Sequence, residues 1–263
     1  MLRHNRGAYA ITPGEYHHRM ARVRAYQQAL TMADWTLFAP LDYRRWAGGT
    51  MAHRDAERSE AVEGDGDPLG LVDPLVGEPL VQEVSAERPV WTEEGVYHGG
   101  QGALLATADG DWDITGDESF TAVIVVEIHT GNQGSNQSLL AKRSGVSGEG
   151  SWRFAILSND NTGVQIDDGE TTVNQFSGRS FYNGRTLMAL RVDREVGDLT
   201  FFADGQIRSG SADISTVGSL ENSGPLTTNG AFGQFCEHTL EAVMIAPGVL
   251  SVETLSDIED LLL

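Results

Sequence analysis

The sequence predicts a mainly β protein, a two-sheet antiparallel jelly-roll sandwich preceded by a short α-helical arm. Three observations support this fold class. Several segments alternate apolar and polar residues with a period of two, which is typical of strands with one buried face. The 263 residues include 31 glycines but only 8 prolines, a balance that indicates many turns. One segment near the beginning instead has the spacing of an α-helix.

That helical segment is expected to run from Thr12 to about Ala33. Thr12 is suited to cap the helix, Pro13 to occupy its first turn, and Glu15 to complete a capping box. Steps of four and three residues then give a mostly apolar seam: Tyr16, Met20, Val23, Gln27 and Leu30. The segment is too short for a stable isolated coiled coil, so the seam predicts packing on a partner or on the rest of the chain.

Charge is distributed unevenly along the chain. Residues 1–58 hold nine arginines and five acids, for a net charge of +4, whereas residues 59–263 carry −24. This asymmetry predicts an attachment or oligomerisation arm over 1–58 that docks on an acidic surface. The alternative is that the helix pairs with its own acidic domain. The docking residues expected on the arm are Arg19, Arg22, Arg24, Tyr16, Met20, Val23 and Leu30.

Residues 59–88 are predicted to be a linker strap, because Pro68, Pro74 and Pro79 recur there after an acidic, glycine-containing stretch. The jelly roll is expected over 89–263. Its clearest half-buried strands are 151–156 and 188–193, and the centres of 120–128 and 240–246 are apolar on both faces. Asp204-Gly205 predicts a hairpin turn. A helix capped by Ser251, with Leu255 and Ile258 on one face, closes the chain.

Composition excludes several classes of protein. The apolar runs are far shorter than the roughly 18 residues of a membrane helix, and the first residues lack the apolar core of a signal peptide. The single cysteine, Cys236, excludes an internal disulfide. A net charge of −20 disfavours nucleic acid as a partner. Lys142 is the only lysine, and an acidic, lysine-poor composition resembles that of halophilic proteins, although a GC-rich genome also favours arginine over lysine.

The order of motifs in 89–263 resembles that of laminin G-like, concanavalin A-type jelly-roll domains, as found in tailed-virus structural proteins. The resemblance is carried by Gly99–Gly102, Asp111–Ile114, Ser119–Val123, Leu139–Lys142, Arg191–Asp193, Leu199–Gly205, Leu240–Ile245 and Gly248–Ser251. It departs from the family near Gly184–Thr186, where a tryptophan is usual, and near Glu237, where a glycine is usual. The resemblance implies a binding module rather than an enzyme, frequently one that holds a calcium ion.

Catalysis is not expected. Related glycan-cleaving enzymes carry a Glu-x-Asp-x-x-Glu strand, because retaining hydrolysis needs two carboxyl groups about 5 Å apart. Glu127 stands in its strand without such a neighbour. Calcium is the only cofactor considered, with Asp160, Asp167 and Asp168 as candidate ligands in loops where the family places its ion. A solvated acidic loop is the alternative interpretation.

Glycan binding is expected where aromatic rings lie beside amide side chains, since sugars stack on rings and amides bind hydroxyls. The candidates are Asn132, Gln133, Asn136, Asn174, Phe176, Tyr182 and Asn183. Ordinary polar loops are the alternative.

Together these features predict a virion surface protein of a tailed virus, located in a capsid, turret, tail or baseplate. It would attach to other virion proteins through the arm, and its lectin-like domain would bind host glycan or glycoprotein as a trimer or pentamer. The alternative is a purely structural decoration protein with no ligand. The expected location is the surface of an extracellular particle, without a signal peptide and without membrane insertion.

Overall fold

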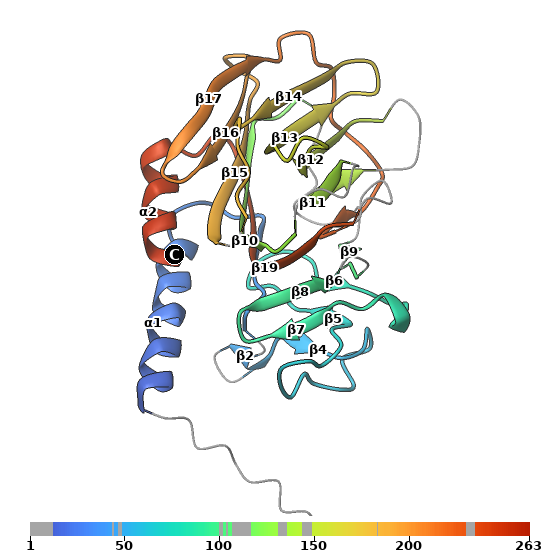
Figure 1. The fold of residues 1–263 in the computed structure, drawn as a ribbon, viewed down its shortest axis with the longest axis vertical. Coiled ribbons are helices and arrows are strands. Elements are labelled where there is room, and N and C mark those ends of the chain that lie inside the picture. Colours follow the sequence, from blue (N-terminus) through green and yellow to red (C-terminus); the bar gives the residue numbers. More distant parts are fainter. Residues whose placement is uncertain are drawn as a thin grey trace, which may run out of the picture.

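The computed structural model of the chain describes residues 13–43, 45–46, 49–99, 102–103, 105–106, 117–130, 136–143, 149–182, 184–229 and 235–263. Every strand pair in these ranges is antiparallel, and the strands build two stacked sheets and one small two-stranded pair. This arrangement confirms the predicted two-sheet antiparallel sandwich (Figure 1).

The first sheet, called sheet I, carries the longest strands. Its order is β17 (Gln206–Asp213), β16 (Asp198–Ala203), β15 (Arg185–Asp193), β10 (Phe120–Ile128), β19 (Glu237–Pro247), β8 (Gly95–Gly99) and β7 (Val90–Thr92). A further strand, β1 (Leu37–Pro40), pairs with β19 beyond the end of β8. The segments 120–128 and 240–246 thus lie side by side at the centre of the sheet, which explains why their sequences are apolar on both faces.

The second sheet, sheet II, is assembled from a regular half and an irregular half. Its order is β14 (Thr172–Phe176), β13 (Thr162–Asp167), β12 (Ser151–Ile156), β11 (Gln137–Arg143), β18 (Leu226–Thr227), β9 (Leu105–Ala106), β6 (Leu80–Val81), β5 (Leu71–Val72) and β4 (Ala52–His53). The small separate pair is β2 (Arg45–Trp46) with β3 (Gly49–Thr50), and a 3₁₀ turn, η1, spans Ser85–Glu87.

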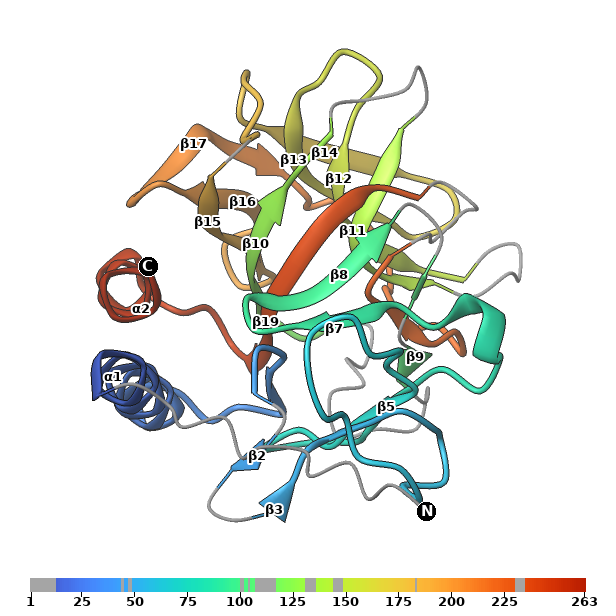
Figure 2. The same ribbon diagram turned by 60° about the horizontal axis from the view of Figure 1, so that its bottom comes forward.

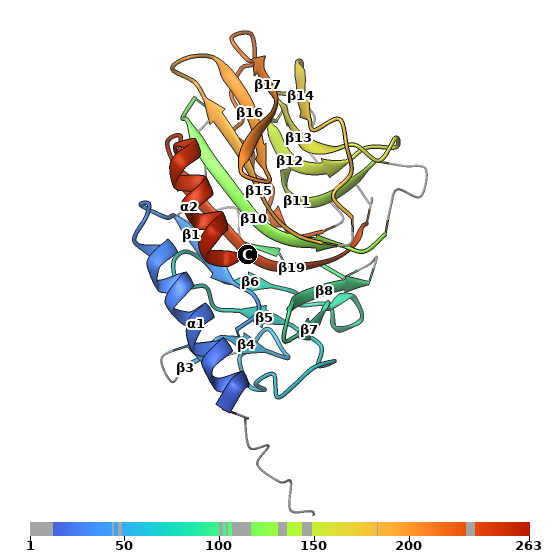
Figure 3. The same cartoon turned by 60° about the vertical axis from the view of Figure 1, so that its left-hand side comes forward.

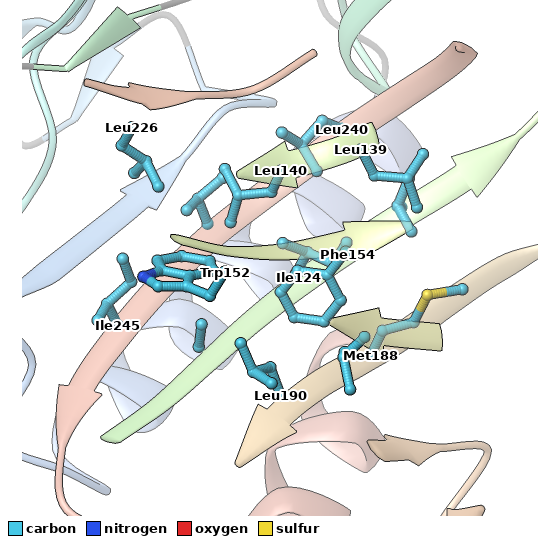
Figure 4. Packing of buried hydrophobic residues seen from close by; sticks show 14 of the residues in the cluster. Ile124, Leu139, Leu140, Trp152, Phe154, Met188, Leu190, Leu226, Leu240 and Ile245 are labelled. Carbon is cyan, nitrogen blue, oxygen red and sulfur yellow. The ribbon is translucent and has the colours of Figure 1, made fainter. Parts of the chain in front are cut away.

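The main core lies between the two sheets. Leu139, Leu140, Trp152 and Phe154 from sheet II face Ile124, Met188, Leu190, Leu240 and Ile245 from sheet I (Figure 4). The Trp152 indole is 1% exposed, and its ring centroid lies 5.6 Å from that of Phe120. Because the inward residues of β12 alternate with outward ones, the sequence pattern of this strand is explained by the sandwich itself.

Two helices, α1 (Pro13–Leu30) and α2 (Val252–Leu262), lie side by side on the outer face of sheet I (Figures 1 and 3). Seen nearly end-on, both helices occupy the same side of the molecule (Figure 2). Ser251 caps α2 as predicted, with its hydroxyl accepting a hydrogen bond from Thr254 N, and Leu255 and Ile258 are buried. In the described part of the chain, no helix combines the length and apolarity needed to cross a membrane.

The packed face of α1 differs from the predicted seam. Ala25, Tyr26 and Ala29 are buried against sheet I and α2, whereas Gln27 of the predicted seam is exposed. Two alanines on the buried face let the helix approach its neighbours closely, and the Tyr26 ring meets Phe38 of β1 edge to face with centroids 6.1 Å apart. Heptad spacing therefore identified the helix but not the face that packs.

The predicted division at residues 58 and 88 also differs from the structure. The segment 1–58 contributes β1 to sheet I and β4 to sheet II, so it is part of the sandwich rather than an arm that projects from it. The expected strap over 59–88 contains β5 and β6, because Leu69, Val72 and Leu80 are apolar enough to be buried in the main core. The recurring prolines led to the prediction of a linker, so these short buried strands were missed.

Candidate functional site

Polar side chains gather on the side of β11–β14 that faces away from the main core. The strand register aligns them in three rows across four strands. We call this surface the β11–β14 face. Its rows are Arg143–Ser151–Asp167–Thr172, Ala141–Arg153–Gln165–Asn174 and Ser138–Ala155–Gly163–Phe176.

Arg153 lies at the centre of this face. Its Nε donates to Gln165 Oε1 at 2.5 Å, and its Nη1 donates to Ser138 Oγ at 3.3 Å. The residue is only 7% exposed, and burial lowers the pKa of the guanidinium, with nearby Arg143 acting in the same direction. A planar group held this way presents its donors in a fixed direction, which suits recognition of oxygen atoms.

One end of the face combines a glycine with an aromatic ring. Gly163 pairs with Phe176, and a Cβ atom at position 163 would overlap the Phe176 ring and the Gln175 carbonyl. The absence of a side chain at 163 therefore allows the half-buried Phe176 ring to lie close over β13. Asn174, two residues earlier on the same side of β14, is exposed.

The other end of the face carries its charged rim. Thr172 Oγ1 donates to Asp167 Oδ2 at 2.6 Å, and Arg143 is exposed on β11. Partial burial lowers the pKa of Arg143, against the opposing field of Asp167. The face thus offers guanidinium and amide donors, amide and carboxylate acceptors, and one aromatic ring.

The predicted glycan-binding residues fall in two places. Asn174 and Phe176 lie on the β11–β14 face. Asn136 and Tyr182 lie at one end of the same strands, where Asn136 Oδ1 accepts from Ser158 N at 3.0 Å and the Tyr182 ring packs against the main core. Asn132, Gln133 and Asn183 lie outside the described residues.

The candidate calcium ligands do not come together. Asp160 precedes β13 and Asp167 ends it, so the strand rise separates them by roughly 20 Å. Asp160 Oδ1 accepts from Tyr182 Oη, whereas Asp168 accepts from the backbone N–H groups of Glu170 and Thr171. The described residues contain no group of three or more His, Cys, Asp or Glu side chains that could hold a metal. Asp160 therefore lies apart from Asp167 and Asp168, and calcium binding at either loop stays a prediction.

Two of the arm residues that were expected to dock on a partner instead bind acidic groups of the same chain. Arg22 Nη2 lies 2.5 Å from Glu241 Oε2 and 3.1 Å from Asp42 Oδ2, and Arg19 pairs with Glu93. This is the alternative arrangement, in which the basic helix pairs intramolecularly. Arg24 is exposed, Met20, Val23 and Leu30 are half-buried, and the side chain of Tyr16 lies outside the described residues.

Arg153 and Gln165 were not singled out as functional residues from the sequence. The signal was present in the alternation of Ser151, Arg153 and Ala155 with buried neighbours, which places an arginine on the outward side of a strand. The alternation does not reveal the register between β12, β13 and β14. That register places Arg153 beside Gln165 and Gln165 beside Asn174.

The fold defines this chain as a β-sandwich of the jelly-roll type. No protein-family model matches the sequence, and no curated protein matches it. Solved structures do share the fold. A Trypanosoma rangeli sialidase, 14% identical, matches 94% of this chain with a TM-score of 0.57. The botulinum neurotoxin serotype D binding domain, 10% identical, matches 80% with a TM-score of 0.53.

A third similar structure is the CBM40 domain of a Ruminococcus gnavus sialidase bound to α2,3-sialyllactose. It is 20% identical over 54% of this chain and 82% of its own length, with a TM-score of 0.46. This chain spans 39% of the trypanosomal sialidase and 50% of the toxin domain. At these identities, the comparisons with the sialidase and the toxin domain establish the sandwich fold alone.

Proposed function

We propose that this chain is a carbohydrate-binding domain whose ligand lies on the β11–β14 face. The observation that carries the proposal is the central row, in which Arg153 is held by Gln165 and followed by the exposed Asn174, with Phe176 beside it. Guanidinium and amide groups pair with sugar hydroxyls, and an aromatic ring supports the apolar face of a pyranose.

The composition of the face favours binding over hydrolysis. Among the residues of its three rows, Asp167 is the only carboxylate, whereas glycoside hydrolysis generally uses two. We therefore propose a binding function and no catalysis, and the arginines on the face make glycans with a carboxylate the first ligands to test.

Asn174→Ala is expected to weaken glycan binding about tenfold. The exposed amide loses its hydrogen bonds to the sugar, worth about 1–1.5 kcal/mol, without disturbing the core. The wild-type chain is first screened on an array of neutral and acidic glycans, and the best ligand is then titrated by calorimetry. Asn159→Ala, at another exposed asparagine, is the matched control and should bind as the wild type does.

A second variant tests the centre of the face. Arg153→Gln removes the buried guanidinium and should abolish measurable binding, whereas Arg191→Gln on sheet I should not. An array on which no glycan binds the folded chain would favour the purely structural decoration role. Binding that survives both Asn174→Ala and Arg153→Gln would place the ligand elsewhere.

We also propose that the domain is displayed on the surface of a tailed-virus particle, as a trimer or pentamer, and that it binds host glycans from there. Arg19 and Arg22 pair within the chain, so support for the proposal comes from the arginine on α1 that stays exposed, Arg24. Weak single-site binding would be strengthened by multivalency. Native mass spectrometry should give the oligomer, and antibodies against the chain should label purified particles. A monomeric chain absent from particles would contradict this assignment.

A further inference from the structure

The outer face of sheet I carries a polar area that begins where α2 ends. Arg185 Nη2 donates to the carbonyl oxygen of Leu262, in the last turn of that helix, at 2.8 Å. From Arg185 the strand register continues across the sheet through Glu127, Thr239 and Tyr97. The residues that flank these three in sequence are all buried, so the three side chains point outward.

Three contacts fix the ring of Tyr97 over β8. Its Oη donates to Glu237 Oε1 at 2.7 Å, and its centroid lies 5.9 Å from that of the His129 ring. A Cβ atom at Gly99 would lie 3.2 Å from Cε1 of the ring, so the glycine leaves space for the ring to lean along the strand. Tyr97 is only half-buried, so an aromatic surface of fixed orientation is open to solvent.

A short side chain lies between larger ones in this area. Thr239 is 5% exposed, and its Oγ1 lies 2.8 Å from His129 Nε2. Glu127 and Tyr97 flank it across the strands, and Glu237 lies two residues before it on β19. All four of its larger neighbours are half-buried. We call these five residues the Tyr97 platform.

The charge of the platform comes from Glu127 and Glu237. Arg185 is the register neighbour of Glu127, but its guanidinium binds the two carboxylate oxygens of Glu241 at 2.5 and 2.6 Å. Among the described residues, no side chain forms an ion pair with Glu127. The platform is therefore negative and rich in acceptors, whereas the β11–β14 face carries arginines.

We infer that the Tyr97 platform is a second carbohydrate site, which binds neutral pyranoses. The apolar face of the sugar ring stacks on Tyr97, and the carboxylates of Glu127 and Glu237 accept hydrogen bonds from its hydroxyls, which are strengthened by the charge. The same carboxylates repel a sugar that carries a carboxylate of its own. This site goes beyond the glycan site proposed above, because it lies on the other sheet and selects a different class of sugar.

Methyl glycosides of glucose and galactose are the probes, each paired with its uronic acid counterpart, which differs only at carbon 6. At least one neutral glycoside should shift the backbone amide signals of Gly99, His129 and Thr239 in nitrogen-15 spectra of the full chain. We expect a dissociation constant on the order of 1 mM for a ligand of this size. The uronic acid at the same concentration should leave these signals in place.

Two variants test the roles of the side chains. Tyr97→Ala should weaken binding of the neutral glycoside about tenfold, since the stacking surface is lost. Glu127→Gln should weaken it about fivefold, since a neutral amide accepts more weakly than a carboxylate. Glu94→Gln, at an exposed glutamate in the turn before β8, is the matched control and should bind as the wild type does. Asn174→Ala, on the other sheet, should not change this binding either.

Spectra of the wild-type chain keep the test independent of whether the variants fold. If no neutral glycoside shifts the platform amides, the inference is overturned, and the site on the β11–β14 face stands or falls by its own variants. Shifts confined to the β11–β14 face, or equal binding of a sugar and its uronic acid at the platform, would also overturn it. So would neutral-sugar binding that Tyr97→Ala leaves intact or that Asn174→Ala abolishes.

Discussion

A chain that begins at residue 59 is expected not to fold into the sandwich. Deletion of residues 1–58 removes α1 and β1. With β1 go the hydrogen bonds that it makes along residues 242–245 of the central strand β19. The measurement is thermal unfolding followed by circular dichroism, with a chain that begins at Pro13 as the reference. The reference should show one cooperative transition, and the shorter chain should show none.

The size of this effect follows from burial. Tyr26, Trp35, Leu37, Phe38 and Leu41 are each at most 7% exposed. Burying such side chains stabilises a fold by about 1.5–3 kcal/mol each, which together is comparable with the 5–15 kcal/mol net stability of a typical domain. A truncated chain that melts at the reference temperature would instead restore the two-part organisation, with 1–58 as a separate arm.

The early segment shows what the sequence could and could not predict. The helix and its start at Pro13 are local features, which the sequence predicts. The pairing of Phe38 with Met244 joins residues about 200 positions apart, and periodicity contains no information about such a partner. The boundary at residue 58 was therefore placed by charge, although packing determines it.

Some features of the candidate site could likewise be predicted from local sequence, and others could not. Alternation along 151–156 places Arg153 outward, and amides near an aromatic ring identified Asn174 and Phe176. The strand over 162–167 was not recognised from the sequence, and it holds Asp160 apart from Asp167 and Asp168. Register across four strands, which brings Arg153, Gln165 and Asn174 into one row, comes only from the three-dimensional fold.

The contact between α1 and the sheet also contains a buried acid, Asp42, that is expected to make stability depend on pH. Its side chain is 2% exposed and lies 3.1 Å from Arg22 on α1. Tyr26 hydrogen bonds to it, and Glu241, which Arg185 also binds, adds a second negative charge nearby. Burial, together with Glu241, raises the pKa of Asp42 from 3.8 to about 7 despite the opposing effect of Arg22.

Lowering the pH from 8 to 5 should therefore raise the contribution of Asp42 to the free energy of unfolding by about 3 kcal/mol. The sign follows because the folded state binds a proton at Asp42 between pH 7 and 4 that the unfolded state does not, so stability falls as the pH rises through this window. Urea unfolding at both pH values measures it. Asp42→Asn should lack this increment, whereas Asp34→Asn, at an exposed acid just after α1, should keep it. An identical pH dependence in the wild type and Asp42→Asn would show that Asp42 is ionised throughout, held by Arg22.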